Sequence, residues 1–306
     1  MARWTAADIP SQQGRRVVVT GTGGLGLEDA LALARAGADV VVAGRNPSRG
    51  EAAVQQVRQA VPGAQVRFEV VDLASLGSIQ AFGERMRGAQ GSLDLLINNA
   101  AVMNPPRRQV TADGLELQLG TNYLGHFALT AHLLPLLRKG TQPRVVSLSS
   151  VAARSGALHF DDLQSEDSYE PMAAYGQSKL ACLMFAFELQ RRSEAGGWGI
   201  QSVAAHPGIS RTELLPNGAG AWSATGMVRR VLWFLFQPAA QGALPTLFAA
   251  TAPQARGGAY YGPDKLGETR GHPAAARIPP QALDTAAAAR LWAESERLTG
   301  VAFPTA

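Results

Sequence analysis

Strand-like and helix-like segments alternate along the first two thirds of the chain. Three runs between residues 15 and 73 have the length of strands and are rich in β-branched residues: RRVVVTG, DVVVAGR and AQVRFEVVDL. Helix-forming segments separate them, and a glycine closes each one. LDLLINNA, PRVVSLSS and IQSVAAHPG are later apolar runs of the same kind. Runs that are apolar on both faces are typical of a parallel sheet with helices on either side, so the sequence predicts an α/β fold with a doubly wound sheet.

A glycine-rich loop, TGTGGLG, joins the first strand-like run to the first helix-like segment. Gly21-x-Gly23-x-x-Gly26 matches one dinucleotide-binding spacing, and Gly21-x-x-Gly24-x-Gly26 falls one residue short of another. Glycines let the backbone approach a pyrophosphate closely, and the N–H groups that open the next helix favour its negative charge. The position of the loop therefore predicts nucleotide binding at the carboxyl edge of the sheet, but the loop alone does not choose between the two spacings.

Composition limits the class of protein. The 306 residues are 46% hydrophobic and 17% charged, without a linker, so we expect one domain over residues 1–306 with an N-terminal extension at about 1–13. A net charge of +4 with scattered arginines argues against nucleic-acid binding. The single cysteine, Cys182, excludes an internal disulfide and indicates a reducing compartment. Because residues 1–14 lack the apolar core of a signal peptide or anchor, we expect a cytoplasmic protein without an integral membrane segment.

The end of the second strand-like run bears on the choice of cofactor. An acidic residue there would bond the 2′-hydroxyl of NAD(H), but the run VVAGR ends in Gly44 and Arg45. A guanidinium suits the 2′-phosphate of NADP(H). The alternative explanation is a surface arginine that opens a helix, and the sequence favours NADP(H) over NAD(H).

Tyr175 and Lys179 are the strongest candidates for catalysis. They stand four residues apart in AAYGQSKLACLMFAFEL, a predicted helix, and therefore share one face. A free tyrosine, with a pKa near ~10, is a weak acid–base group at neutral pH, and a neighbouring ammonium favours the phenolate. Because such a pair also occurs by chance on helix surfaces, it needs support from other residues. Ser149 and Ser150 at a predicted strand end, and Asn122 inside a predicted helix where asparagine is unfavourable, provide that support.

The alternation weakens after Gly208. Residues 209–236 combine small residues with the apolar run VLWFLF, and we expect a substrate lid or plain packing there rather than a membrane-touching surface. GGAYYGP is a predicted last strand, and residues at about 280–300 form a predicted closing amphipathic helix.

The five histidines have no ligand-like spacing with cysteines or carboxylates, so no metal site is expected.

Taken in order, these segments resemble the short-chain dehydrogenase/reductase family, and more closely its retinol-dehydrogenase-like branch. TGTGGLG, INNAAVMNPP, TNYLGHFALT, RVVSLSS and HPGISRTEL carry the family likeness. The long insert FDDLQSEDSYEPM before Tyr175 and the closing LWAESERLTG are typical of the branch. The resemblance implies a single Rossmann-type domain with a mostly parallel, seven-stranded sheet. It also identifies the opening loop as a family loop that has lost one residue.

The resemblance implies a role for each site residue. Tyr175 is the general acid/base, Lys179 tunes Tyr175 and holds the nicotinamide ribose, Ser150 orients the carbonyl, and Asn122 holds a proton-relay water. The residues implied to bind the cofactor are Gly21, Thr22, Gly24, Leu25, Gly26, Arg45, Asp72, Leu73, Asn99, Ala100, Tyr175, Lys179, Pro207, Gly208 and Thr212. The implied activity is an NADP(H)-dependent interconversion of a carbonyl and an alcohol in a small molecule. The aromatic segment WFLF indicates that this substrate is lipophilic. A homodimer or homotetramer is common in the family.

The chain departs from the family pattern in three places. The glycine loop is one residue short, which leaves Arg45 to recognise the adenosine end alone; Ala101 replaces a glycine; and Thr121 stands where an aliphatic residue is common. We expect an ordinary backbone at Ala101, because a positive φ would strain it. Two other functions stay open. One is reduction of a C=C or C=N bond, and the other is a dinucleotide-binding sensor, which would not need the four catalytic residues.

Overall fold

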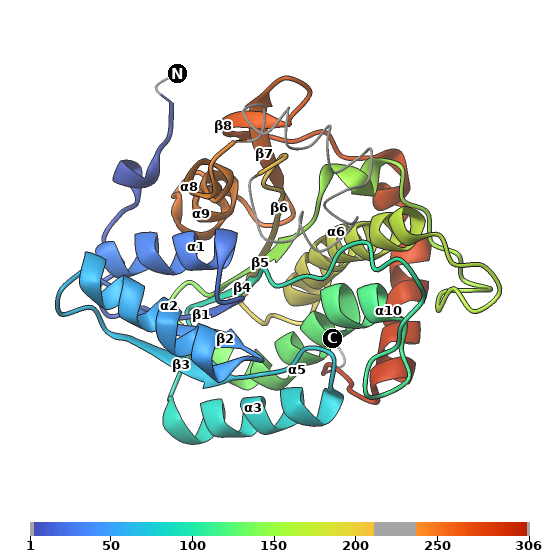
Figure 1. The fold of residues 1–306 in the computed structure, drawn as a ribbon, viewed down its shortest axis with the longest axis horizontal. Coiled ribbons are helices and arrows are strands. Elements are labelled where there is room, and N and C mark those ends of the chain that lie inside the picture. Colours follow the sequence, from blue (N-terminus) through green and yellow to red (C-terminus); the bar gives the residue numbers. More distant parts are fainter. Residues whose placement is uncertain (1–2, 211–236, 305–306) are drawn as a thin grey trace.

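A twisted sheet runs through the centre of the molecule (Figure 1). The computed structural model describes residues 3–210 and 237–304, and within these ranges the sheet has eight strands. They are β1 (Arg16–Thr20), β2 (Asp39–Gly44), β3 (Val66–Val70), β4 (Leu95–Asn98), β5 (Arg144–Leu148), β6 (Gln201–Ala205), β7 (Tyr260–Lys265) and β8 (Arg270–Ala275). The spatial order is β3-β2-β1-β4-β5-β6-β7-β8. The order reverses between β1 and β4, which is where a doubly wound sheet opens a crevice for a ligand.

The predicted number of strands was wrong by one. The strands from β3 to β7 pair in parallel, as expected, but β8 pairs antiparallel with β7 and forms the edge of the sheet. Gly271 and Pro273 interrupt the apolar pattern of β8, so its residues do not show the pattern of a strand. An edge strand tolerates a proline, because the missing N–H costs no bond on the open side.

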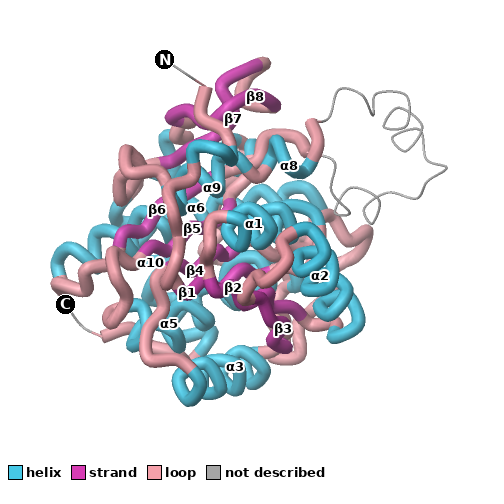
Figure 2. The backbone as a smooth tube through the Cα atoms, turned by 90° about the vertical axis from the view of Figure 1, so that its left-hand side faces the viewer, coloured by secondary structure: helices cyan, strands magenta, loops and turns pink. Residues whose placement is uncertain are grey.

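Helices cover both faces of the sheet (Figures 1 and 2). The α-helices are α1 (Gly24–Arg35), α2 (Pro47–Ala60), α3 (Leu76–Ala89), α4 (Leu117–Leu119), α5 (Gly125–Leu137), α6 (Pro171–Ala195), α8 (Ala239–Gly242), α9 (Leu244–Thr251) and α10 (Thr285–Thr299). Shorter turns are the 3₁₀ segments η1 (Ala6–Asp8), η3 (Val151–Arg154) and η5 (Pro280–Leu283), and the π-helical turn η2 (Gly120–Leu124). Val18 of β1 packs in the cluster with α3, α5 and α6, whereas Val17 and Val19 pack in the cluster with α1, α2 and α9. Successive residues of one strand thus enter opposite layers, which is why the strands are apolar throughout.

The C-terminal helix α10 covers the outer side of α5 and α6. Its N-cap, Asp284, accepts a hydrogen bond from Ala287 N, and Gly300, with a φ of 65°, ends it. The ring of Trp292 lies 5.0 Å from Phe127 of α5 and 5.7 Å from Phe185 of α6, centroid to centroid. The apolar run LACLMFAFEL of α6 is therefore core within one chain.

Candidate functional site

The glycine loop closes tightly against the start of α1. Helix α1 begins at Gly24, and its N-cap, Gly23, has no side chain to bond the first N–H groups of the helix. Gly21 and Gly24 have φ values of 104° and 53°, and a Cβ at Gly26 would lie 2.6 Å from the Gly21 oxygen. The glycines are thus required by backbone conformation and close approach. The turn leaves N–H groups at a helix N-terminus free for an anion.

A cleft of about 540 Å³ opens at the carboxyl edge of the sheet, over this loop. Of the residues that the sequence assigned to the site, those that line it are Gly21, Thr22, Gly24, Leu25, Arg45, Asp72, Leu73, Asn99, Ala100, Tyr175, Lys179 and Pro207. Four other predicted site residues do not line the cleft, but each directly follows a residue that does: Gly26, Asn122, Ser150 and Gly208. Thr212 lies outside the described residues, as does the expected lid apart from residues 209 and 210. The structure therefore brings most of the predicted site into one cleft.

Strand β2 ends in the cleft without an acidic side chain. A Cβ at Gly44 would lie 2.7 Å from the methyl group of Thr22, so the shortened loop packs directly against the end of this strand. Arg45, Asn46 and Arg49 follow and line the same end of the cleft. Asn46 caps α2 by accepting a hydrogen bond from Arg49 N at 3.0 Å. Sequence reasoning missed Arg49, although a second arginine one helical turn beyond Arg45 was the signal that could have found it.

Tyr175 and Lys179 are buried on one face of α6, as their spacing predicted. The Nζ atom of Lys179 lies 5.9 Å from the centre of the Tyr175 ring and donates a hydrogen bond to the Leu148 oxygen at 3.1 Å. Among the described residues no carboxylate pairs with Lys179. A buried ammonium without a counter-ion stabilises negative charge that develops beside it.

The two serines at the end of β5 have different surroundings. Ser149 is buried and donates its hydroxyl hydrogen to the Lys179 main-chain oxygen at 2.7 Å. Ser150 is half-buried and accepts a hydrogen bond from Ala152 N, which makes it the N-cap of η3. No acceptor for the Ser150 hydroxyl hydrogen is found in the described part of the chain, so this hydroxyl is the one that keeps a hydrogen to donate.

Asn122 lies in the π-helical turn η2, where the helix carries one extra residue. Its side chain accepts a hydrogen bond from Val102 N at 2.7 Å and donates to the Val102 oxygen at 2.9 Å. It also donates to Ser178 Oγ at 3.0 Å. The unfavourable helix residue is thus fully bonded, and it ties the loop after β4 to α6. π-turns occur preferentially at functional sites.

A buried imidazole that the sequence analysis set aside also belongs to the site. The ring nitrogens of His126 lie 2.9 Å from the Asn122 main-chain oxygen and 2.9 Å from Thr20 Oγ1. Thr20 Oγ1 in turn accepts hydrogen bonds from Asn99 N and Ala100 N. Burial lowers the pKa of His126 to about 4, so the ring is neutral at physiological pH. It connects the turn η2, which carries Asn122, through Thr20 to Asn99 and Ala100, which line the cleft.

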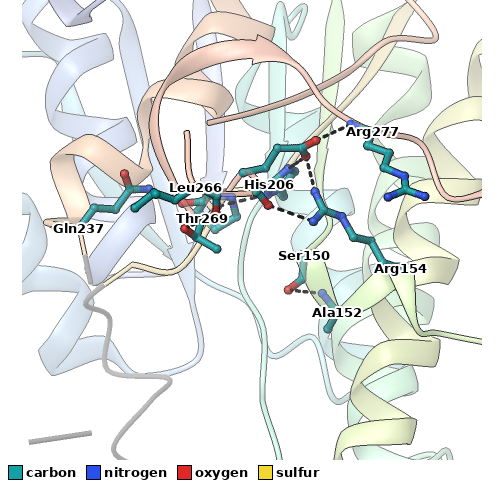
Figure 3. A network of polar contacts seen from close by, with 12 residues as sticks. Ser150, Ala152, Arg154, His206, Gln237, Leu266, Thr269 and Arg277 are labelled. Atoms are coloured by element: carbon teal, nitrogen blue, oxygen red, sulfur yellow. Dashed lines mark hydrogen bonds and ion pairs between the residues drawn. The ribbon is translucent and has the colours of Figure 1, made fainter. Parts of the chain in front are cut away.

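A second buried histidine supports the opposite side of the cleft (Figure 3). His206 accepts a hydrogen bond from Gly208 N at Nδ1, so its Nε2 carries the hydrogen and donates to Glu268 at 3.0 Å. Glu268 also pairs with Arg154 at 2.6 Å and accepts from Arg277 N. Partial burial opposes ionisation of Glu268, but these bonds and charges together lower its pKa. The network joins the end of β6, the β7–β8 turn and the segment that follows Ser150.

The backbone at Ala101 has the ordinary conformation that the sequence predicts. Ala101 has no positive φ. Cys182 is buried and donates from Sγ to the Asn122 oxygen, which fits a core residue.

Within residues 3–210 and 237–304, no cluster of His, Cys, Asp and Glu is arranged to hold a metal ion. In the same ranges, no helix combines the length and apolar character needed to cross a membrane.

Comparison with known proteins agrees with this arrangement. The family model described as short chain dehydrogenase matches residues 15–219. The chain is 40% identical to the polyprenol dehydrogenase of Mus musculus over 95% of this chain and 86% of that protein. It is 39% identical to retinol dehydrogenase 13 of Mus musculus over 97% and 86% of the two chains.

Solved structures show the same fold. An uncharacterized protein from Mycobacterium paratuberculosis superposes with a TM-score of 0.82 at 40% identity, and the match covers 99% of this chain and 100% of that one. A short chain dehydrogenase from Shigella flexneri, complexed with NADP, superposes with a TM-score of 0.63 at 21% identity over 83% and 98% of the chains. The chain thus belongs to the retinol-dehydrogenase-like branch of the short-chain dehydrogenase/reductase family, whose members are nicotinamide-dependent oxidoreductases of alcohol/carbonyl pairs.

Proposed function

We propose that the protein interconverts a carbonyl and an alcohol in a lipophilic substrate with NADP(H), and that Tyr175 is the general acid/base. The observation that carries the proposal is the position of Tyr175 and Lys179, which line the same cleft as the glycine loop. The N-terminus of α1 would hold the pyrophosphate of a dinucleotide, and the cleft has lining residues on both sides of this point. Arg45 and Arg49 would hold the adenosine end of such a cofactor, and Tyr175 would face its nicotinamide end.

The residues present fit such a cofactor. The uncapped N-terminus of α1 offers backbone N–H groups to the pyrophosphate. Thr121 lines the cleft, and its buried hydroxyl has no hydrogen-bond partner in the described structure, which is unusual for a buried polar group and suits a ligand contact. Arg45 and Arg49 supply the positive charge that favours a 2′-phosphate, and the end of β2 that lines the cleft, Ala43 and Gly44, has no carboxylate that would repel it. These features support NADP(H) over NAD(H).

In the proposed mechanism the bound cofactor supplies or accepts the hydride. Tyr175 donates its phenolic proton to the carbonyl oxygen during reduction and takes it back from the alcohol during oxidation. Lys179 stabilises the phenolate that reduction leaves on Tyr175, because its charge is buried nearby and has no carboxylate partner in the described structure. Ser150 donates its free hydroxyl hydrogen to the same substrate oxygen, which orients the carbonyl.

Apolar side chains in the cleft that Tyr175 lines support a lipophilic substrate. Val102, Met103, Pro105 and Leu117 line the cleft together with Tyr175. None of them carries a charge or a side-chain hydrogen-bonding group, so they favour an apolar substituent on the reacting carbon. The relatives named as polyprenol and retinol dehydrogenases agree with this class of substrate.

Turnover of carbonyl compounds tests the proposal. The wild-type protein is assayed with NADPH and with NADH against aldehydes, ketones, enones and imines, and the Tyr175→Phe variant is assayed in parallel. We expect carbonyl reduction with a preference for NADPH, a loss of kcat in Tyr175→Phe of about 10²-fold or more, and little change in its NADPH dissociation constant. Turnover confined to C=C or C=N bonds would support the rival reductase. NADPH binding without any turnover would support the sensor.

A further inference from the structure

An apolar wall of the cleft that Tyr175 lines is formed by a loop without helix or strand structure. It runs from Val102 to Pro106, and Val102, Met103, Pro105 and Pro106 line the cleft. The two prolines have no N–H group, so the loop lacks the donors from which a helix or strand is built. Asn104, just before them, has a φ of 58°, which is uncommon for a residue other than glycine. The position of this wall must therefore be fixed by residues outside the loop.

Three buried or half-buried side chains fix the loop at successive positions. The Asn122 side chain bonds both the N–H and the oxygen of Val102. Gln118 Oε1 accepts a hydrogen bond from Asn104 N at 2.8 Å. Tyr169 Oη donates to the Pro105 oxygen at 2.9 Å. The main chain of the loop is thereby held at Val102, Asn104 and Pro105.

Tyr169 comes from the insert that precedes the catalytic helix. Its hydroxyl also accepts a hydrogen bond from Gln118 Nε2 at 3.2 Å, and Gln118 in addition donates to the Pro171 oxygen, at the start of α6. Gln118 is fully buried, with its amide bonded to Asn104, Tyr169 and Pro171. Burial, together with the nearby Glu116 carboxylate, raises the pKa of Tyr169 to about 12, so the hydroxyl keeps the proton that it donates.

Further contacts join the insert to the residues that follow the wall. Arg108 Nε donates to the Gln164 main-chain oxygen at 2.9 Å, and Gln164 Oε1 accepts from Glu116 N at 2.7 Å. These bonds make the insert one unit with the loop that lines the cleft. The sequence could not show this, because the partners lie 48 to 64 positions apart in the chain.

We propose that Tyr169 is a positioning residue for substrate selection, which fixes Pro105 through its hydroxyl and so sets the apolar wall that Met103 and Pro105 present beside Tyr175. The inference rests on the proposed carbonyl reductase function, since the wall has this meaning only if the substrate reacts at Tyr175. It assigns to the insert a role in choosing the apolar part of the substrate. Proton transfer itself does not involve Tyr169.

Steady-state kinetics with a short and a long linear aldehyde, propanal and decanal, test this role. Tyr169→Phe keeps the ring and removes the hydroxyl. We expect KM for decanal to rise by about 3–10-fold, the loss expected for one hydrogen bond, while KM for propanal and the dissociation constant for NADPH change much less. Tyr261→Phe is the matched control, because its hydroxyl accepts a hydrogen bond from Arg256 N and does not line the cleft.

A double variant shows whether Tyr169 acts through the wall. Met103→Ala removes most of the Met103 side chain from the wall, so less apolar contact is left for Tyr169 to position. Tyr169→Phe should therefore raise KM for decanal less in the Met103→Ala background than in the wild type. Additive losses, or equal losses for propanal and decanal, would overturn the inference while leaving the carbonyl reductase function in place. Wild-type protein that reduces neither aldehyde nor any other carbonyl would overturn the proposed function, and this inference with it.

Discussion

The Nδ1 atom of His126 lies 2.9 Å from the main-chain oxygen of Asn122, four residues earlier in the same helix. On its other side the ring meets Thr20 Oγ1, which already accepts hydrogen bonds from Asn99 N and Ala100 N. The Asn122 oxygen can only accept, so Nδ1 of the ring carries the hydrogen, and Nε2 is left as an acceptor that faces Thr20 Oγ1, whose hydroxyl also has the Ile97 oxygen as an acceptor at 3.2 Å. His126 is thus fixed as the neutral tautomer with its hydrogen on Nδ1.

Protonation of His126 should destabilise the fold in mild acid. Its pKa is near 6.5 when unfolded and about 4 when folded, so the neutral ring stabilises the fold above pH 6.5, and this contribution is lost as the pH falls toward 4. The loss amounts to roughly 3 kcal/mol. His126→Gln should lower the free energy of unfolding at pH 7 by about 1–3 kcal/mol. Its difference from the wild type should shrink at pH 4.5, as measured by urea unfolding at both pH values.

The control for this prediction is His159→Gln, which changes an exposed imidazole. Its unfolding free energy should follow that of the wild type at both pH values. A constant gap between His126→Gln and the wild type from pH 7 to pH 4.5 would show that His126 does not titrate in the manner described.

Glu268 should contribute more to stability than an ordinary surface carboxylate. Its removal leaves the buried Nε2–H of His206 without an acceptor, and it also removes the partner of Arg154. Glu268→Ala should therefore cost about 2–3 kcal/mol, because an unpaired buried donor carries its full desolvation penalty. Glu166→Ala is the control, since this 70% exposed carboxylate pairs with Arg108 on the surface and its removal should cost less than ~1 kcal/mol. Equal losses in urea unfolding would contradict the importance of the network.

Arg45→Glu should shift the cofactor preference toward NADH. The substitution places a carboxylate where the proposed 2′-phosphate lies and supplies an acceptor for the 2′-hydroxyl of NADH. We expect the ratio of kcat/KM with NADPH to that with NADH to fall by about tenfold or more. Arg35→Glu changes an equally exposed arginine outside the cleft and should leave the ratio unchanged. An unaltered ratio in Arg45→Glu would exclude this arginine from cofactor selection.

Local signals explain which parts of the fold and site could be predicted. The alternation of apolar runs, the glycine loop and the Tyr175–Lys179 spacing are each contained in a few neighbouring residues, and the structure places them as the sequence suggested. Strand β8 was missed because it is an edge strand with a glycine and a proline. It is extended because it pairs with β7, and its own sequence has little preference for a strand.

The remaining parts of the site depend on contacts between distant segments. His126 looks the same in sequence whether it packs in a core or bonds Thr20, 106 positions away. Tyr169 lies in a polar insert, and only the fold shows that it bonds Pro105. Neither residue carries a local motif, so their contributions follow from tertiary structure alone.

Asp29 of α1 is a buried carboxyl group without a hydrogen-bond partner in the described structure. Its side chain is fully buried, and both oxygens are unpaired. Burial, with a smaller effect of Glu28, raises its pKa well above the ordinary value. The unfolded chain therefore releases its proton near pH 4 while the folded chain retains it, so the stability of the fold falls as the pH rises above about 4.

Removing this carboxyl group should stabilise the protein. Asp29→Ala replaces an unpaired polar group with the best helix-forming residue, and we expect a gain of about 1–3 kcal/mol at pH 7. The gain should be smaller at pH 4, because the carboxyl group is then protonated in the folded and unfolded chain alike. Glu28→Ala, one residue earlier in the same helix, removes a half-exposed carboxylate and should change the stability by less than ~0.5 kcal/mol. A loss of stability in Asp29→Ala at pH 7 would mean that the carboxyl group has a stabilising partner in solution, such as a buried water.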